Sequence, residues 1–283
     1  LLDNLPSSIH VVFASRTQPP LFIERRKVRG QLIEVTSVEL AFIAEETALF
    51  LKQRLSGTVS DDSIFVLQKR TEGWAAAVQL AVLSMQRDLP MAKEGSVLTR
   101  ALTDLDEEVI RYLFDEVISA LDQEVRNFVI DTSPLACFST ELLDGIFSIK
   151  NSDEIIEGLK DKNLFIQSLH GEADWYRFHE LFREALLSQF EKKTRKQRHQ
   201  LHAKAAFAFE AIGHKEEAIE HHLAAEQWSH ASELVEGISY GRVLGSEDAL
   251  SESLLDRLPE AELQNRPKLL LIKAWSLFRS NNI

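Results

Sequence analysis

Residues 163–182, NLFIQSLHGEADWYRFHELF, decide the fold predicted for this chain. Apolar and aromatic residues that favour strands lie on both sides of a polar segment, residues 170–174, whose composition suits a hairpin loop. From Glu180 onward the apolar residues recur at helical spacing. Helices are expected before the hairpin, so the order helix, helix, hairpin, helix predicts a winged-helix-like module. His179 stands at the start of its last helix.

The composition limits the classes of protein that need to be considered. A chain of 283 residues with 45% hydrophobic and 27% charged residues is typical of a soluble globular protein with more than one domain. Its net charge of -12 argues against a strongly basic nucleic-acid surface, so we do not expect the wing to bind DNA. The single cysteine, Cys137, excludes internal disulfides. With no apolar run near the ~18 residues that span a bilayer and no signal peptide, we expect a cytoplasmic protein without a membrane partner.

Two short runs near the start, SIHVVFA at residues 8–14 and QLIEV at residues 31–35, predict buried strands. Arg16 follows the first run, at the edge of a sheet where α/β domains bind ligands, and its guanidinium could meet a phosphate. A surface arginine in a loop is the alternative. Two strands do not form an independent sheet, so we expect their partners before residue 1, in a larger protein of which this chain is an internal part.

Helices are predicted over residues 38–55, 61–69 and 75–85, and the last two flank the dipeptide Gly73-Trp74. A glycine at this point permits a close approach by a flat ligand or by another backbone. The indole of Trp74 could stack on a nucleobase or fill a core, and physical reasoning alone favours the core.

Further helices over residues 104–121, 122–132, 140–147 and 153–162 lead into the hairpin. Beyond residue 193 the helices become rich in alanine and are joined by glycine-bearing turns, which indicates an α-solenoid of tetratricopeptide-like type. Several histidines in this part invite a metal site, but no cysteine or HExxH-type motif accompanies them, so we predict no metal; they are His199, His202, His214, His221 and His222. No catalytic residue is predicted.

Six segments together resemble one family. They are LPSSIHVVFASRTQPP, VRGQLIEV, LAFIAEETALFL, RTEGWAAAVQLAVLS, NLFIQSLHGEADWYRFHELF and GHKEEAIEHHLAAEQWSHASELV. Their content and order resemble the MalT-like, LuxR-family transcriptional activators of the STAND class, the signal-transduction ATPases with numerous domains. The resemblance covers nearly the whole chain.

The resemblance implies a mainly α fold in four parts. These are the C-terminal remnant of a P-loop α/β nucleotide-binding domain (residues 1–36), a helical lid (37–103), a winged-helix-like domain (104–192) and the start of a tetratricopeptide-like superhelix (193–283). It also implies that the chain lacks the family's phosphate loop and its C-terminal helix-turn-helix. The chain would then contact DNA only through a domain that it does not contain.

The resemblance assigns nucleotide-binding roles to four residues. Arg16 is similar to the sensor arginine that reads the nucleotide's phosphates. Gly73 and Trp74 resemble the GxP-type motif beside the adenine, although Ala75 stands where proline is usual. His179 resembles the winged-helix histidine that contacts the β-phosphate of ADP and keeps the resting state closed, whereas the residues alone favour a histidine packed in an aromatic cluster.

The function implied is that of the central regulatory portion of an ATP/ADP-switched transcriptional activator, with Mg²⁺ bound in the full-length protein. An inducer, either a small molecule or a protein, would bind the superhelix and permit self-association. The chain itself would not be an enzyme, although the full-length protein would be a slow ATPase switch. The alternative is a tetratricopeptide-type scaffold for protein–protein interaction that binds no nucleotide.

Overall fold

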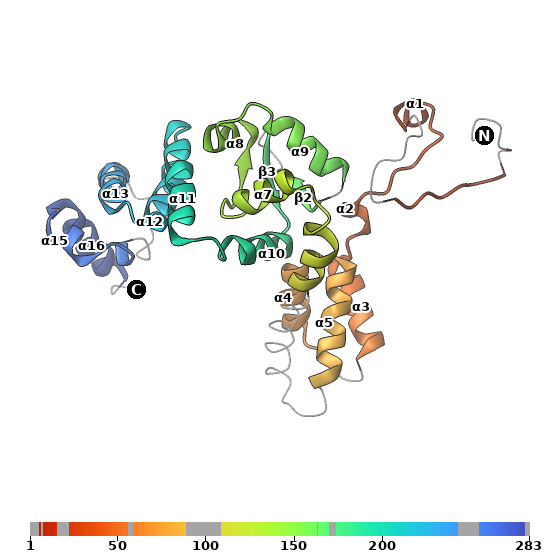
Figure 1. The fold of residues 1–283 in the computed structure, drawn as a ribbon. Coiled ribbons are helices and arrows are strands. Elements are labelled where there is room, and N and C mark those ends of the chain that lie inside the picture. Colours follow the sequence, from red (N-terminus) through yellow and green to blue (C-terminus); the bar gives the residue numbers. More distant parts are fainter. Residues whose placement is uncertain are drawn as a thin grey trace. The chain divides into compact units, whose positions relative to one another are not determined.

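The computed structural model describes residues 6, 8–15, 23–55, 59–88, 109–162, 164–169, 174–242 and 255–280. It is mainly helical with one small sheet (Figure 1). The chain packs into two compact units. Unit 1 comprises Leu1–Leu113, Glu154–Gln167 and His179–Phe182, and unit 2 comprises Phe114–Asp153, Ser168–Phe178 and Arg183–Ile283.

The first helices are short, and three longer ones follow them in unit 1. In chain order they are α1 (Ile23–Val28), α2 (Ser37–Leu40), α3 (Ala44–Arg54), α4 (Asp61–Thr71) and α5 (Ala75–Asp88). Helices α3, α4 and α5 lie side by side (Figure 1). Their shared core buries Leu51 of α3, Leu67 of α4 and Val78 of α5 completely. Full burial of such side chains contributes about 1.5–3 kcal/mol each.

The strands predicted at residues 8–14 and 31–35 are wrong for the residues that the structure describes. Residues 8–15 and 31–36 carry no strand, and Val12 and Ile33 are 91% and 92% exposed. Both runs have the β-branched composition of buried strands, but a strand is stabilised by its ladder partners and by the surface that covers it. Within the described part of the chain, no segment supplies either of them to these two runs.

The helix predicted over residues 38–55 is broken into α2 and α3. At the break the amide of Phe42 donates to the carbonyl of Gly73 at 2.8 Å, and Ile43 is extended. The Glu46 carboxylate then accepts from the Ile43 amide at 3.0 Å, which caps the start of α3. A tertiary hydrogen bond and a local cap therefore replace one turn of the expected helix.

The winged-helix elements follow the predicted order closely. They are a short π-helical turn, η2 (Phe114–Ile118), then α7 (Gln123–Thr132), β1 (Phe138–Ser139), α8 (Thr140–Phe147), α9 (Ser152–Asp161), β2 (Ile166–Ser168), β3 (Trp175–Phe178) and α10 (Glu180–Phe190). The hydroxyl of Ser139 accepts from the Leu142 amide at 3.2 Å and so caps α8.

The sheet of three strands has the order β1-β3-β2. Strand β1 was not predicted, because two residues are too few to show a period. It pairs antiparallel with β3 in the register Phe138 with Tyr176 and Ser139 with Trp175. Phe138 and Phe178 are buried with their ring centroids 5.1 Å apart, so they anchor this sheet in its core.

The C-terminal helices of unit 2 pack in sequence. They are α11 (Arg195–Ala211), α12 (Lys215–Ala224), α13 (Trp228–Arg242), α15 (Glu260–Gln264) and α16 (Pro267–Ser280). Each of α11, α12 and α13 contacts the next, and α16 contacts α13 and α15. Thr194 and Gln197 form a capping box at the start of α11. The region is helical as predicted, and its identity as the start of a tetratricopeptide-like superhelix stays a prediction.

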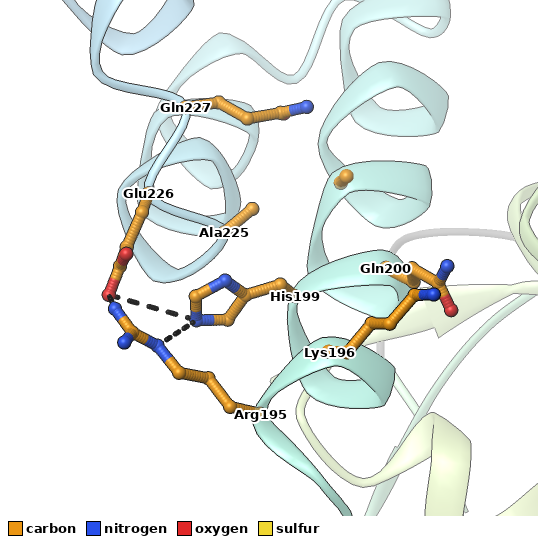
Figure 2. Close-up of a pocket in the computed structure, with 8 residues that line it drawn as sticks. Arg195, Lys196, His199, Gln200, Ala225, Glu226 and Gln227 are labelled. Atoms are coloured by element: carbon orange, nitrogen blue, oxygen red, sulfur yellow. Dashed lines mark hydrogen bonds and ion pairs between the residues drawn. The ribbon is translucent and has the colours of Figure 1, made fainter.

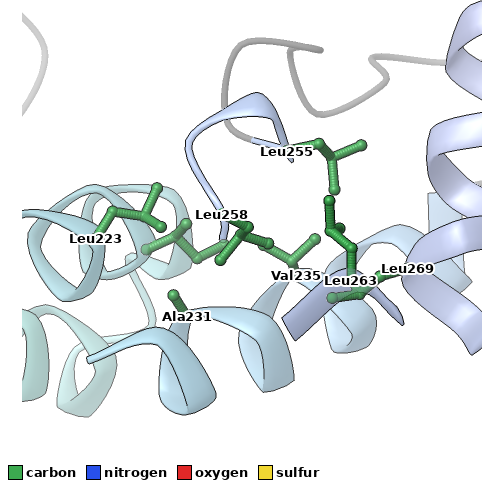
Figure 3. Packing of buried hydrophobic residues seen from close by; sticks show 8 residues of the cluster. Leu223, Ala231, Val235, Leu255, Leu258, Leu263 and Leu269 are labelled. Carbon is green, nitrogen blue, oxygen red and sulfur yellow. The ribbon is translucent and has the colours of Figure 1, made fainter. Parts of the chain in front are cut away.

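One hydrophobic cluster joins the last helices (Figure 3). It contains Ile219, Leu223, Ala231, Val235, Leu255, Leu258, Leu263 and Leu269, all at most 6% exposed. These residues come from α12, α13, α15, α16 and the segment 255–258 before α15. The helices therefore share a single core and are not independent hairpins.

None of the helices in the part of the chain that the structure describes is long and apolar enough to cross a lipid bilayer.

Candidate functional site

The turn between α4 and α5 is the centre of the candidate site, because it carries Gly73 and Trp74. Glu72 and Gly73 both have left-handed backbones, with φ of 49° and 75°. The turn is closed by the amide of Trp74, which donates to the carbonyl of Thr71 at 2.8 Å. Two consecutive left-handed residues reverse the chain sharply, so α5 begins at once beside α4.

Gly73 is required here by contact as well as by conformation. A Cβ atom at this position would lie 2.2 Å from the carbonyl oxygen of Phe42. The same oxygen accepts a hydrogen bond of 2.7 Å from Nε2 of Gln68, whose Oε1 accepts from the Thr47 hydroxyl at 2.6 Å. The close approach that the sequence suggested at Gly73 is thus made by the Phe42 backbone.

Trp74 is half-buried among other rings of unit 1. Its indole meets Phe165 edge-on at a centroid distance of 5.1 Å and His179 at 6.2 Å, and Tyr112 lies 6.3 Å away. Phe165 has φ of 53°, a left-handed backbone that is strained for a bulky residue, and it stacks on buried Phe182. The indole therefore rests on an aromatic cluster, the arrangement that physical reasoning favoured.

His179 lies in the same cluster and is 6% exposed. Its Nε2 is 3.0 Å from the carbonyl oxygen of Thr71, which can only accept, so Nε2 carries the proton of this bond. The backbone amide of His179 donates to the carbonyl of Phe165 at 2.7 Å. Both the ring and the backbone of His179 are therefore held before α10 begins.

The structure brings three of the four predicted nucleotide-binding residues together. Gly73, Trp74 and His179 lie in unit 1 around the α4–α5 turn, joined through Thr71. Arg16, the fourth, lies outside the described residues. The nucleotide roles of all four stay predictions.

Sequence reasoning missed the residues that complete this junction. Phe42 and Gln68 bracket Gly73, Phe165 packs on Trp74, and Glu72 bonds to the start of α10. Gln68 is near Gly73 in the sequence, but the contacts of Phe42, Phe165 and Glu72 join residues from 31 (73 − 42) to 108 positions apart, so no local period marks them. The one available signal was Gly73 itself, which indicated that something must approach closely.

A second polar feature lies in unit 2, where the start of α11 faces the turn between α12 and α13 (Figure 2). An open pocket of about 550 Å³ lies here, lined by Arg195, Lys196, His199, Gln200, Ala203, Ala225, Glu226 and Gln227. Arg195 forms an ion pair with Glu226, and their hydrogen bond lowers the pKa of that carboxyl and raises the pKa of the guanidinium. This ion pair connects the turn between α12 and α13 to the start of α11.

The histidines of α11 and α12 form a packed cluster rather than a surface array. Nδ1 of His202 lies 2.9 Å from Nδ1 of His221, whose ring stacks on Phe209. His222 is fully buried, with Nδ1 2.7 Å from Gln227 Oε1 and with Nε2 bonded to Glu210. His221 and His222 are therefore buried between the helices. Alanine-rich helices approach closely enough to enclose them.

Across the described ranges, no three histidine, cysteine, aspartate or glutamate side chains gather in a group that could hold a metal ion.

Comparison with known proteins gives the chain its family. Residues 114–199 match the family model of the MalT winged helix domain. The chain is 31% identical over 278 residues to the HTH-type transcriptional regulator MalT of Vibrio campbellii, and 32% identical over 275 residues to that of Serratia proteamaculans. Each comparison covers 97% of this chain and 30% of the relative's length. This chain therefore belongs to the MalT-like proteins, and residues 114–199 are its counterpart of the MalT winged helix domain.

Proposed function

We propose that this chain is the central regulatory portion of a cytoplasmic transcription regulator that is switched by ATP and ADP. The relatives are named as transcriptional regulators, and the chain spans about a third of their length. The observation that supports the switch most is the junction at the α4–α5 turn, where Trp74 and His179 pack against each other. Their proximity was implied only by the family resemblance, and they are 105 positions apart in the sequence (179 − 74).

The side chains at this junction suit a nucleotide in kind. A half-buried indole offers an apolar face for a base, and an imidazole at the start of a helix is a suitable neighbour for a phosphate. The nucleotide would supply the base that packs on the indole and the phosphate charge that meets the imidazole. The chain's own contribution is to hold His179 and Trp74 in fixed positions, through the carbonyls of Thr71 and Phe165.

In this proposal the remaining parts act on that junction. Helices α11 to α16 take the inducer, and its binding loosens the contact around His179. The regulator then self-associates and acts on DNA through a helix-turn-helix; the relatives are named HTH-type transcriptional regulators. Arg16 reads the phosphates, and Mg²⁺ accompanies ATP in the full-length protein.

A scaffold without a nucleotide is the second candidate, and one observation favours it. The helices from α12 to α16 share a continuous hydrophobic core, as protein-binding helical repeats do. The two candidates differ in whether the full-length gene product binds ADP at all.

The 283-residue chain alone is expected to bind ATP and ADP weakly or not at all and to hydrolyse neither. The sequence contains no GxxxxGK[ST] phosphate loop, the element whose backbone cradles nucleotide phosphates. Isothermal titration calorimetry and a phosphate-release assay check this. Micromolar affinity for either nucleotide would contradict it.

His179→Ala is expected to speed ADP release about tenfold or more in the full-length gene product and to raise its basal transcriptional activity. Because Nε2 donates to the Thr71 carbonyl, the phosphate in this proposal is met by Nδ1–H of the protonated ring. One hydrogen bond to a charged group contributes about 1.5–3 kcal/mol, and tenfold corresponds to about 1.4 kcal/mol. Stopped-flow release of a fluorescent ADP measures the rate, with His10→Ala, at an exposed histidine of unit 1, as the control. Unchanged release would remove the role proposed for His179.

A further inference from the structure

The carboxylate of Glu72 joins three segments that are far apart in the sequence. Its Oε1 accepts from the backbone amide of Glu180, the first residue of α10, at 3.3 Å. Its Oε2 accepts from Nε2 of Gln167 in β2 at 3.2 Å. One side chain therefore connects the end of α4, the hairpin strand β2 and the start of α10.

This contact takes the place of a local helix cap. The first amides of a helix have no acceptor within the helix, and the residue just before it usually supplies one. In α10 that residue is His179, whose ring bonds to the carbonyl of Thr71. The acceptor for Glu180 comes instead from Glu72, 108 positions earlier, and its negative charge also suits the positive end of the helix dipole.

Two successive residues of one segment thus hold two successive residues of another. Thr71 accepts from the ring of His179, and Glu72 accepts from the amide of Glu180. Glu72 reaches this position from a left-handed backbone, which a glutamate adopts only when surrounding contacts support it. With the amide of Glu180 fixed, the His179 ring stays against Trp74 and on the Thr71 carbonyl.

We propose that Glu72 is the positioning residue for His179. Its carboxylate holds the start of α10 on the α4–α5 turn, so that the His179 ring keeps one orientation and one tautomer, with the proton on Nε2. The positioning of His179 by Glu72 is argued from contacts within this chain. Its consequence for nucleotide retention depends on the proposed function. A ligand that binds His179 would therefore disturb the end of α4 as well as the start of α10, because Thr71 and Glu72 connect the two.

The first test uses the 283-residue chain with Glu72→Ala and Glu72→Gln. Glu45→Ala is the matched control, since Glu45 is an exposed glutamate in the first turn of α3. In Glu72→Ala, amide exchange at Glu180 should quicken about fivefold, as expected for the loss of one hydrogen bond of ~1 kcal/mol. Glu72→Gln keeps an acceptor oxygen and should restore most of the protection. It also tests the proposal if the alanine variant does not fold.

The second measurement is one that a purely structural role would not change. The ¹⁵N shifts of the His179 ring should report the Nε2-protonated tautomer in the wild-type chain and in Glu72→Gln, and a tautomer mixture in Glu72→Ala. An unchanged tautomer together with unchanged Glu180 exchange in Glu72→Ala would overturn the proposal.

ADP release from the full-length gene product separates this inference from the proposed function. If both Glu72→Ala and His179→Ala speed release, both stand. If only His179→Ala does, the positioning role of Glu72 fails and the nucleotide switch remains. If neither does while the His179 tautomer still changes in Glu72→Ala, Glu72 positions the ring but the proposed function fails.

Discussion

Gly73→Ala is expected to destabilise unit 1 by about 2–5 kcal/mol and to loosen the junction around Trp74. A left-handed backbone costs a residue with a Cβ about 1–2 kcal/mol, and forcing extra volume into a packed site costs about 1–3 kcal/mol. The added Cβ would stand 2.2 Å from the Phe42 oxygen, so the backbone of one segment must move. Urea unfolding followed by Trp fluorescence measures the change.

Gly213→Ala is the matched control for this substitution. Gly213 has φ of 85°, but nothing lies within 4 Å of a Cβ placed there. Its alanine variant therefore reports the cost of the backbone conformation alone. Equal losses of stability in the two variants would show that the contact with Phe42 contributes nothing.

The helices α11 and α12 are expected to lose stability as the pH falls below about 6.5, on the order of a few kcal/mol by pH 5. Burial, followed by the charges of His199 and Arg198, lowers the pKa of His202 to about 4. Burial, followed by the charges of His202, His222 and Arg183, lowers the pKa of His221 to about 3. Circular dichroism with urea at pH 7, 6 and 5 measures the effect.

The direction follows from the number of protons bound in each state. An unfolded histidine takes up its proton near pH 6.5, whereas these two folded rings stay neutral until about pH 4 and 3. Between pH 6.5 and these folded pKa values the unfolded chain binds more protons than the folded chain, so a falling pH favours unfolding. The stability that the two neutral, buried histidines contribute is fully present above about pH 7. The structure offers the same reason, because two protonated rings cannot share the Nδ1–Nδ1 contact of 2.9 Å.

His221→Gln should flatten this pH dependence between pH 6.5 and 5, above the range in which most carboxylates titrate. His10→Gln, at an exposed histidine outside the cluster, should leave the slope unchanged. A slope in His221→Gln that equals the wild-type slope would exclude the histidine pair as its origin.

Local chemistry made the helices and the hairpin of residues 114–199 predictable. Ser139, a residue type that favours helix starts, caps α8, and the change from strand to helix at His179 falls where the apolar period changes. The strand predictions at residues 8–14 and 31–35 failed because a strand depends on partners as much as on composition. The break before α3 could not be predicted from the sequence, because it coincides with a tertiary contact, the hydrogen bond from the Phe42 amide to the Gly73 carbonyl.

Three residues of the candidate site could be predicted from the sequence, but the contacts that hold them in place could not. Gly73, Trp74 and His179 were selected by resemblance, and Gly73 also by its missing Cβ. The residues that hold them, Glu72 and Phe165, have left-handed backbones that no propensity predicts for glutamate or phenylalanine. The left-handed conformation at such positions depends on the packing of segments that are distant in the sequence, so it cannot be predicted from a single sequence.

The composition of unit 1 bears on how the winged helix could be separated from the rest of the chain. The match to the MalT winged helix domain begins at residue 114, yet residues 154–167 and 179–182 fold with the helices that precede it. An excised piece covering 114–199 would leave Trp74 behind and uncover the rings of Phe165 and His179 that pack on it. The segment that matches the family model is therefore not the segment that packs as one compact unit, and a protein expressed from residue 37 onward should be more stable than one expressed from residue 114.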